Sequence, residues 1–144
     1  MIIKQISIFV ENKPGRLAEI TETIAAAGID IRSICIADTP DFGILRLIVD
    51  KPEQAALTLK EAGLTVSITN VIAVGIDDTP GAFSVPVRML ADAGIGIEYM
   101  YAFVSRDTKK AYVILRVSDN DAATKVLLEN NVTLLDEAGL HGIK

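Results

Sequence analysis

The chain has 144 residues, of which half are apolar and 23% are charged. This is the composition of a globular protein with a substantial core, and no apolar run approaches the roughly 20 residues that a membrane-spanning helix needs. The net charge is −5, from 14 basic and 19 acidic residues. Binding to nucleic-acid backbones or anionic membranes depends on clustered Lys and Arg, so we expect neither partner.

The cysteine content and the start of the chain both indicate a reducing compartment. Cys35 is the only cysteine, which excludes disulfides within the chain and cysteine-rich metal sites. We interpret it as a small apolar residue of a strand. The first residues lack the long apolar core and the cleavage site of a signal peptide. The expected location is therefore cytoplasmic.

The first half of the chain predicts the element order βαββαβ. Its first strand alternates, so that Ile6, Ile8 and Val10 share one face. A Pro-Gly turn and a helix ending at Gly28 follow, because Pro suits a first helical turn and Gly a helix end. Two strands then form a hairpin before the second helix and the last strand. The predicted ranges are 2–10, 29–37, 42–49 and 64–69 for the strands, with the second helix from Pro52 to Gly63.

The second half repeats the first. Residues 78–97 match residues 12–31 at an offset of 66 positions, so that Gly15 corresponds to Gly81, and fixed offsets of this kind indicate duplication. A polar hairpin tip at 106–110 is two residues longer than its counterpart, after which the offset is 68. We predict two domains, 1–70 and 71–144. The further ranges are helix 82–93, bent by Pro86, strands 95–104, 112–117 and 132–135, helix 121–129, and a frayed tail at 139–144.

The duplicated motif resembles that of a pair of ACT domains. Members of this family have a turn of the Asp/Asn-x-Pro-Gly-x-Leu kind and a helix that ends in Ala-Gly-Ile-x-Ile. Residues 12–17 read NKPGRL and residues 78–83 read DTPGAF, and the helices end in AGIDI and AGIGI. Phe83 departs from the aliphatic residue of the family. The resemblance covers nearly the whole chain and implies an α+β fold of two ferredoxin-like βαββαβ repeats, with antiparallel sheets, helices on one face, and sheets joined side by side.

The resemblance also implies a regulatory module that binds a small ligand, commonly an amino acid, near the two turns. The residues fit this role, because helix N-termini offer N–H groups to a carboxylate, while acidic side chains can accept hydrogen bonds from an ammonium. The alternative is that Asn12 and Asp78 only cap helices. Arg16 faces Ala82 across the repeat, so the two sites should bind unequally. The candidate ligand-binding residues are Glu11, Asn12, Pro14, Gly15, Arg16, Leu17, Asp77, Asp78, Pro80, Gly81, Ala82 and Phe83.

Two further patterns concern surfaces. Val85 and Met89 replace Glu19 and Thr23, so the flank of the helix in the second copy becomes apolar; exposed apolar flanks usually mark interfaces, here with a second copy or an enzyme. Tyr99, Tyr101 and Phe103 share one face of a strand, either as a cover for a joined sheet or as a core lining.

No catalytic constellation is present. His141 is the only histidine, and neither a P-loop nor a dinucleotide fingerprint occurs. Together with this absence, the resemblance to ACT domains implies a non-catalytic amino-acid sensor without cofactor or metal that acts allosterically, and we expect it to be a homodimer. The related alternative is a regulatory subunit of an amino-acid biosynthetic enzyme such as acetolactate synthase. An RNA-binding βαββαβ module is disfavoured, because the strand at 71–76 has no aromatic residue and the net charge is negative.

Overall fold

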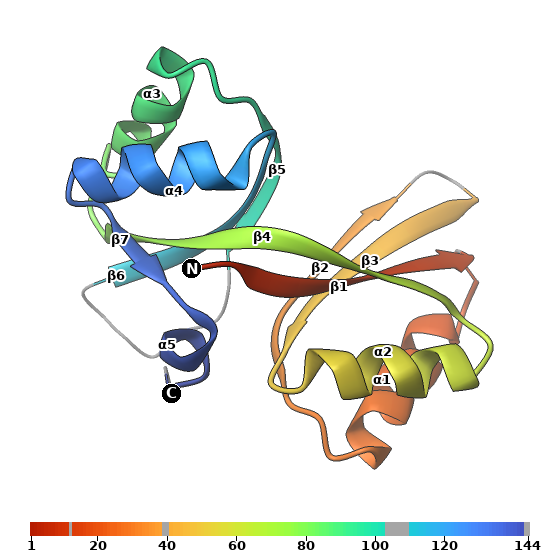
Figure 1. The fold of residues 1–144 in the computed structure, drawn as a ribbon. Helices are drawn as coiled ribbons and strands as arrows, with labels where there is room; N and C mark the ends of the chain where they lie inside the picture. Colours follow the sequence, from red (N-terminus) through yellow and green to blue (C-terminus); the bar gives the residue numbers. More distant parts are fainter. Residues whose placement is uncertain (12, 39–40, 103–109, 143–144) are drawn as a thin grey trace. The chain divides into compact units, whose positions relative to one another are not determined.

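The computed structural model describes residues 1–11, 13–38, 41–102 and 110–142, and Figure 1 shows its helices and strands. The chain divides into two compact units. We call Lys4–Thr69 the first unit and Asn70–Lys144 together with Met1–Ile3 the second unit. The strand β4 (Thr65–Asp77) contains the boundary between them within its 13 residues, so no linker joins the repeats.

The first unit has the predicted βαββαβ order. Its further elements are β1 (Ile3–Glu11), α1 (Arg16–Ala26), β2 (Ile31–Asp38), β3 (Phe42–Val49) and α2 (Pro52–Glu61). The strands lie in the order β2-β3-β1-β4, and β3 is antiparallel to both β1 and β2.

The core of the first unit lies between this sheet and its two helices. The alternation of β1 places Ile6, Ile8 and Val10 in the core and leaves Phe9 exposed, as the sequence predicts. Ile20 and Ile24 of α1 pack against the same cluster. Apolar residues recur about every 3.6 residues in the helices and every 2 residues in the strands, so each element has one apolar face. These faces therefore pack together on one side of the sheet.

The second unit repeats this arrangement. Its elements are the end of β4, α3 (Ser84–Asp92), β5 (Ile97–Ala102), β6 (Lys110–Val117), α4 (Asn120–Glu129) and β7 (Thr133–Leu135). The order β5-β6-β4-β7 is equivalent to that of the first unit. Leu90 of α3 and Leu127 of α4 pack with Ile72, Val74 and Leu115. The predicted α+β fold of two ferredoxin-like repeats is confirmed.

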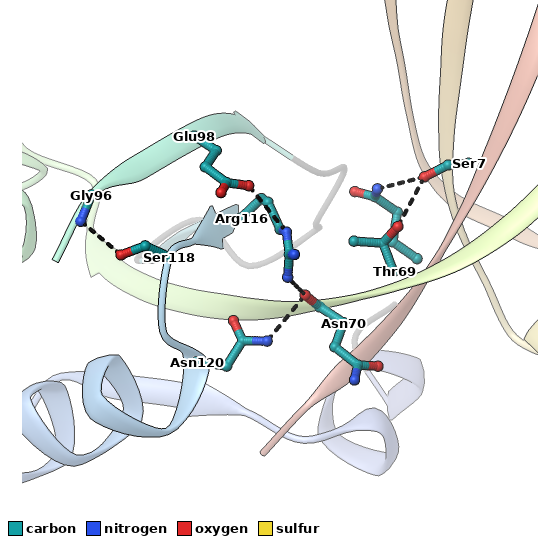
Figure 2. A network of polar contacts seen from close by, with 9 residues as sticks. Ser7, Thr69, Asn70, Gly96, Glu98, Arg116, Ser118 and Asn120 are labelled. Atoms are coloured by element: carbon teal, nitrogen blue, oxygen red, sulfur yellow. Dashed lines mark hydrogen bonds and ion pairs between the residues drawn. The ribbon is translucent and has the colours of Figure 1, made fainter.

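Polar contacts hold β4 on each side of the unit boundary (Figure 2). In the first unit, the hydroxyls of Thr69 and Ser7 lie 3.4 Å apart. In the second unit, the carbonyl of Asn70 accepts two hydrogen bonds, from Arg116 Nη1 at 2.9 Å and from Asn120 Nδ2 at 3.2 Å. Arg116 also pairs with Glu98 at 3.3 Å. These bonds fix the strand from which the second turn emerges.

The helix α3 begins later than predicted, and this changes the role of Pro86. The turn residues 80–83 precede the helix, so Pro86 lies in its first turn rather than inside it. The first N–H groups of a helix have no helical acceptor, so a proline here removes no helical hydrogen bond. The predicted bend at this residue is therefore wrong.

Residues 137–142 form a helix, so the prediction of a frayed tail is wrong for residues 139–142, and residues 143 and 144 lie outside the described part of the chain. The helix α5 (Glu137–Gly142) follows β7, and its Leu140 is 1% exposed. Asp136 accepts hydrogen bonds from Gly139 N to its Oδ1 at 2.6 Å and from Leu140 N to its carbonyl at 2.9 Å. Figure 1 draws α5 on the side of β7 away from α3 and α4. The first unit has no equivalent helix, because its last strand, β4, continues directly into the second unit.

Of the three aromatic residues predicted to share one face of a strand, Tyr99, Tyr101 and Phe103, Tyr101 is buried. It lies opposite Ile114, which lies opposite Ala73, and all three are buried. The equivalent row in the first unit, at the offsets of 66 and 68, is Cys35 with Arg46 and Ser7, and these three residues are half-buried. Phe103 lies outside the described residues.

Replacement of Leu140 tests the packing of α5. We expect Leu140→Ala to lower the free energy of unfolding by about 2 kcal/mol, because a buried leucine loses its transfer energy and leaves a cavity. The matched control is Leu128→Ala, at a position of the same unit that is 44% exposed, with an expected change of at most about 0.5 kcal/mol. Urea unfolding measures both, and equal effects would contradict the packing of α5.

Candidate ligand-binding site

The first turn joins β1 to α1 through a glycine with a left-handed backbone. Gly15 has φ 85° and directly precedes the helix. The amide of Arg16 donates to Lys13 O at 3.2 Å, and that of Glu19 donates to Gly15 O at 3.0 Å. The N–H groups of Leu17 and Ala18 come before the first full helical bond, so they remain for water or a ligand.

The second turn follows β4 and is longer. Gly81 has φ 84°, and its carbonyl accepts hydrogen bonds from the amide of Ser84 at 3.1 Å and from its hydroxyl at 2.7 Å. Phe83 occupies the N-cap position of α3, and no side chain caps this helix. The alternative role of Asp78 as a helix cap is therefore wrong, because this residue lies five positions before the cap. Asn12 lies outside the described residues.

A small pocket of about 120 Å³ lies beside the first turn. It is bounded by the end of β1, the start of α1 and the strands β2 and β3. Its walls combine three charged side chains with apolar ones. The lining residues are Val10, Glu11, Lys13, Arg16, Leu17, Ile20, Ile36, Gly43 and Leu45.

The charges of the first pocket pair with one another. Lys13 Nζ lies 2.7 Å from Glu11 Oε2, and Arg16 Nη1 lies 3.3 Å from Glu19 Oε2. The hydrogen bond and the charge of Lys13, with a smaller contribution from Arg16, hold the pKa of Glu11 below its usual value. The carboxylate of Glu11 is thus favoured in its ionised form, in which it pairs with the ammonium of Lys13.

A larger pocket of about 450 Å³ lies at the second turn, and it opens toward different neighbours. The turn and α3 form one side, and the connection from α4 to β7 forms the other. Asp77 and Lys110 both line it, with Oδ1 and Nζ 3.4 Å apart. The lining residues are Gly75, Ile76, Asp77, Thr79, Pro80, Gly81, Ala82, Val85, Pro86, Met89, Lys110, Asn130, Asn131, Val132 and Thr133.

Each turn has a carboxylate next to a lysine ammonium, but the lysine lies on the turn itself in the first unit and on the neighbouring strand in the second. Glu11 lies opposite Phe42 across β1 and β3, whereas the equivalent Asp77 lies opposite Lys110 across β4 and β6. The first unit supplies its cation from the turn itself, as Lys13. An acid and a base side by side match the ammonium and carboxylate of a zwitterion, since each can be satisfied by the opposite charge.

The pockets contain only part of the predicted set of residues. Glu11, Arg16 and Leu17 line the first pocket, while Pro14 and Gly15 shape the turn beside it. Phe83 packs against the core of the second unit. The lining residues of the second pocket include four predicted ones: Asp77, Pro80, Gly81 and Ala82.

The prediction missed Lys13, Lys110, Asn130 and Asn131, which line the pockets. The hairpin register could have indicated Lys110, because it is the strand partner of Asp77. The two asparagines end α4, and their approach to the second turn depends on the packing of α4 beside α3. No local sequence signal indicates this contact.

The described residues offer no metal centre, since no three His, Cys, Asp or Glu side chains among them gather as ligands. No helix in the described ranges is long and apolar enough to cross a membrane. What the turns offer is backbone N–H groups, paired charges and apolar walls, which suit the binding of a small polar molecule.

The structure thus contains two copies of one unit, each with an antiparallel sheet and with a pocket at its strand-to-helix turn. The family profile described as "ACT domain pair" matches residues 1–143. The chain therefore belongs to the ACT-domain family, as a pair of ACT domains.

Solved structures have the same fold. Protein BT0572 from Bacteroides thetaiotaomicron is 41% identical, with a TM-score of 0.93 over 99% of this chain and 98% of that one. The regulatory subunit of aspartate kinase from Thermus thermophilus, in its ligand-free form, shares the fold at 19% identity and a TM-score of 0.63, over 88% and 91% of the two chains. No curated protein sequence matches the chain.

The lowered pKa of Glu11 can be tested directly. We expect Lys13→Met to raise this pKa toward the ordinary range, because the substitution removes the main stabilisation of the charged form. A depressed folded pKa contributes stability that is present above the unfolded pKa and is lost as pH falls through the folded pKa. Above pH 5, the variant should therefore lack the contribution that the ionised Glu11 makes to the free energy of unfolding.

The titration is followed by NMR of the side-chain carboxyl carbons. Glu53 is the internal control, because Lys4 lowers its pKa independently. Lys13 does not lower the pKa of Glu11 if Lys13→Met leaves the titration of Glu11 unchanged or shifts that of Glu53 equally.

Proposed function

We propose that the protein is a non-catalytic sensor that binds an amino acid at the two strand-to-helix turns and regulates amino-acid metabolism allosterically. The observation that carries this proposal is the acid–ammonium pair that lines each pocket: Glu11 with Lys13, and Asp77 with Lys110. When a zwitterion binds, its ammonium can pair with the acid and its carboxylate with the lysine, in place of the contact between these two side chains. Binding therefore leaves no charge unpaired.

The backbone of each turn supports the same proposal. The N–H groups at the start of α1 point to a site for the ligand carboxylate, in addition to Lys13, because helix N-termini favour anions. Gly15 and Gly81 have no side chain to shield the turn. Membership of the ACT family adds that regulatory ligand binding is the role expected of such a pair.

The two sites should differ in affinity. The first pocket is about a quarter of the volume of the second, and Arg16 adds a positive charge that Ala82 does not. We propose that the second, larger pocket accommodates the side chain of the ligand.

Four features expected from the sequence remain predictions. They are the division between residues 70 and 71, the side-by-side joining of the sheets, the homodimer and the cytoplasmic location.

A regulatory subunit of a separate enzyme is the second candidate. The Thermus thermophilus protein of the same fold is a regulatory subunit of aspartate kinase, and this describes that protein. Co-purification of a biosynthetic enzyme with the tagged native protein would favour this candidate over a free-standing sensor.

Isothermal titration calorimetry of the full chain with each of the twenty amino acids tests the proposal. We expect at least one to bind, and the double variant Asp77→Asn/Lys110→Met to weaken binding at the second turn about tenfold or more, because it removes both charged contacts. The control is Lys4→Met/Glu53→Gln, which removes an exposed ion pair that lines neither pocket. The proposal fails if no amino acid binds, or if both double variants weaken binding equally.

A further inference from the structure

The second pocket has an apolar side as well as a charged one. Val85, Pro86 and Met89 of α3 line it together with Ile76 and Val132. Pro86 has no N–H to offer, so this side of the pocket presents carbon to a ligand. Val85 is 51% exposed and therefore has apolar surface that a ligand can still cover.

The apolar side continues beyond the pocket along α3. A shallow hollow on this helix shares Val85 and Met89 with the pocket and extends to Val87 and Ala91. Arg88 in the hollow is paired with Asp92 at 3.1 Å. A chain of a few carbon atoms that leaves the charged end of the pocket along α3 thus meets mainly apolar surface.

The equivalent flank of the first unit is polar. Glu19 and Thr23 stand at the positions of Val85 and Met89, at the offset of 66. Glu19 pairs with Arg16 at 3.3 Å, and Thr23 Oγ1 donates to Glu19 O at 2.7 Å. The apolar flank therefore belongs to the second copy alone, and it lies where the larger pocket is.

We infer that the second pocket selects an amino acid with an aliphatic side chain, and that Val85 and Met89 determine this specificity. This inference rests on the proposed function. Asp77 and Lys110 hold the ammonium and the carboxylate, and the aliphatic group lies against α3. Both charged side chains among the described lining residues are then engaged, so none remains for an ionised ligand side chain. The apolar flank formed by Val85 and Met89 is then a wall of the pocket, whereas the sequence predicts a protein interface there.

The test compares leucine with asparagine, which is similar in size but polar. Calorimetry uses the full chain with Glu11→Gln and Lys13→Met, so that the charged pair of the first pocket is absent. We expect leucine to bind about tenfold tighter or more, because apolar contact of one or two methyl groups discriminates by this order.

The swap Val85→Glu/Met89→Thr then gives the second copy the residues of the first. We expect it to abolish the preference for leucine by weakening leucine about tenfold, with asparagine changed by about twofold at most. The reciprocal swap Glu19→Val/Thr23→Met is the matched control and should leave the preference unchanged. Light scattering measures the molecular mass of each variant in the same buffers.

The outcomes separate this inference from the function on which it rests. If amino acids bind without a preference for leucine, or if the Val85/Met89 swap leaves the preference intact, the inference is wrong and the sensor remains. If the swap removes the preference but also changes the molecular mass, the flank is a protein interface and the inference is again wrong. If no amino acid binds even to the unaltered chain, both the inference and the proposed function fail.

Discussion

The left-handed backbone of one glycine in each repeat is the constraint on which both candidate sites depend. Gly15 and Gly81 have φ near 85°, and a Cβ built at either position would meet no atom within 4 Å. Space is therefore not what requires glycine; the backbone conformation is, because other L-residues adopt it at a cost of about 1 kcal/mol or more. This conformation turns the chain from the strand end into the helix, and so brings a strand-end acid beside a helix N-terminus.

Gene duplication has kept this backbone and changed what surrounds it. The acid persists at the strand end as Glu11 and Asp77, but its positive partner is on the turn in one copy and on the neighbouring strand in the other. The pocket of the first unit faces β2 and β3, and that of the second faces the end of α4. A regulatory protein with two unequal sites of this kind can respond to one ligand over two concentration ranges, or to two ligands.

The sequence predicts the fold well because its signals are local and occur twice. The alternation in β1 and the Pro-Gly turns identify their elements without tertiary information, and the second copy repeats the same signals in the same order. The prediction is wrong where a residue's role depends on distant packing. Leu140 gives no periodic signal in so short a helix, yet it is buried, and Pro86 could be placed in a first turn only once the start of α3 was known. The same reason explains the pocket residues Asn130 and Asn131, which reach the second turn through the packing of α4.

An amino acid held between the paired charges of the second turn would change the amide NMR spectrum of the labelled full chain around that turn. On titration with leucine, we expect saturable shifts for the amides of Asp77, Gly81, Val85 and Lys110, with little change at the exposed face of α2 around Leu57. Shifts confined to other parts of the chain, or no saturable shift at the second turn with any amino acid, would contradict binding at this turn.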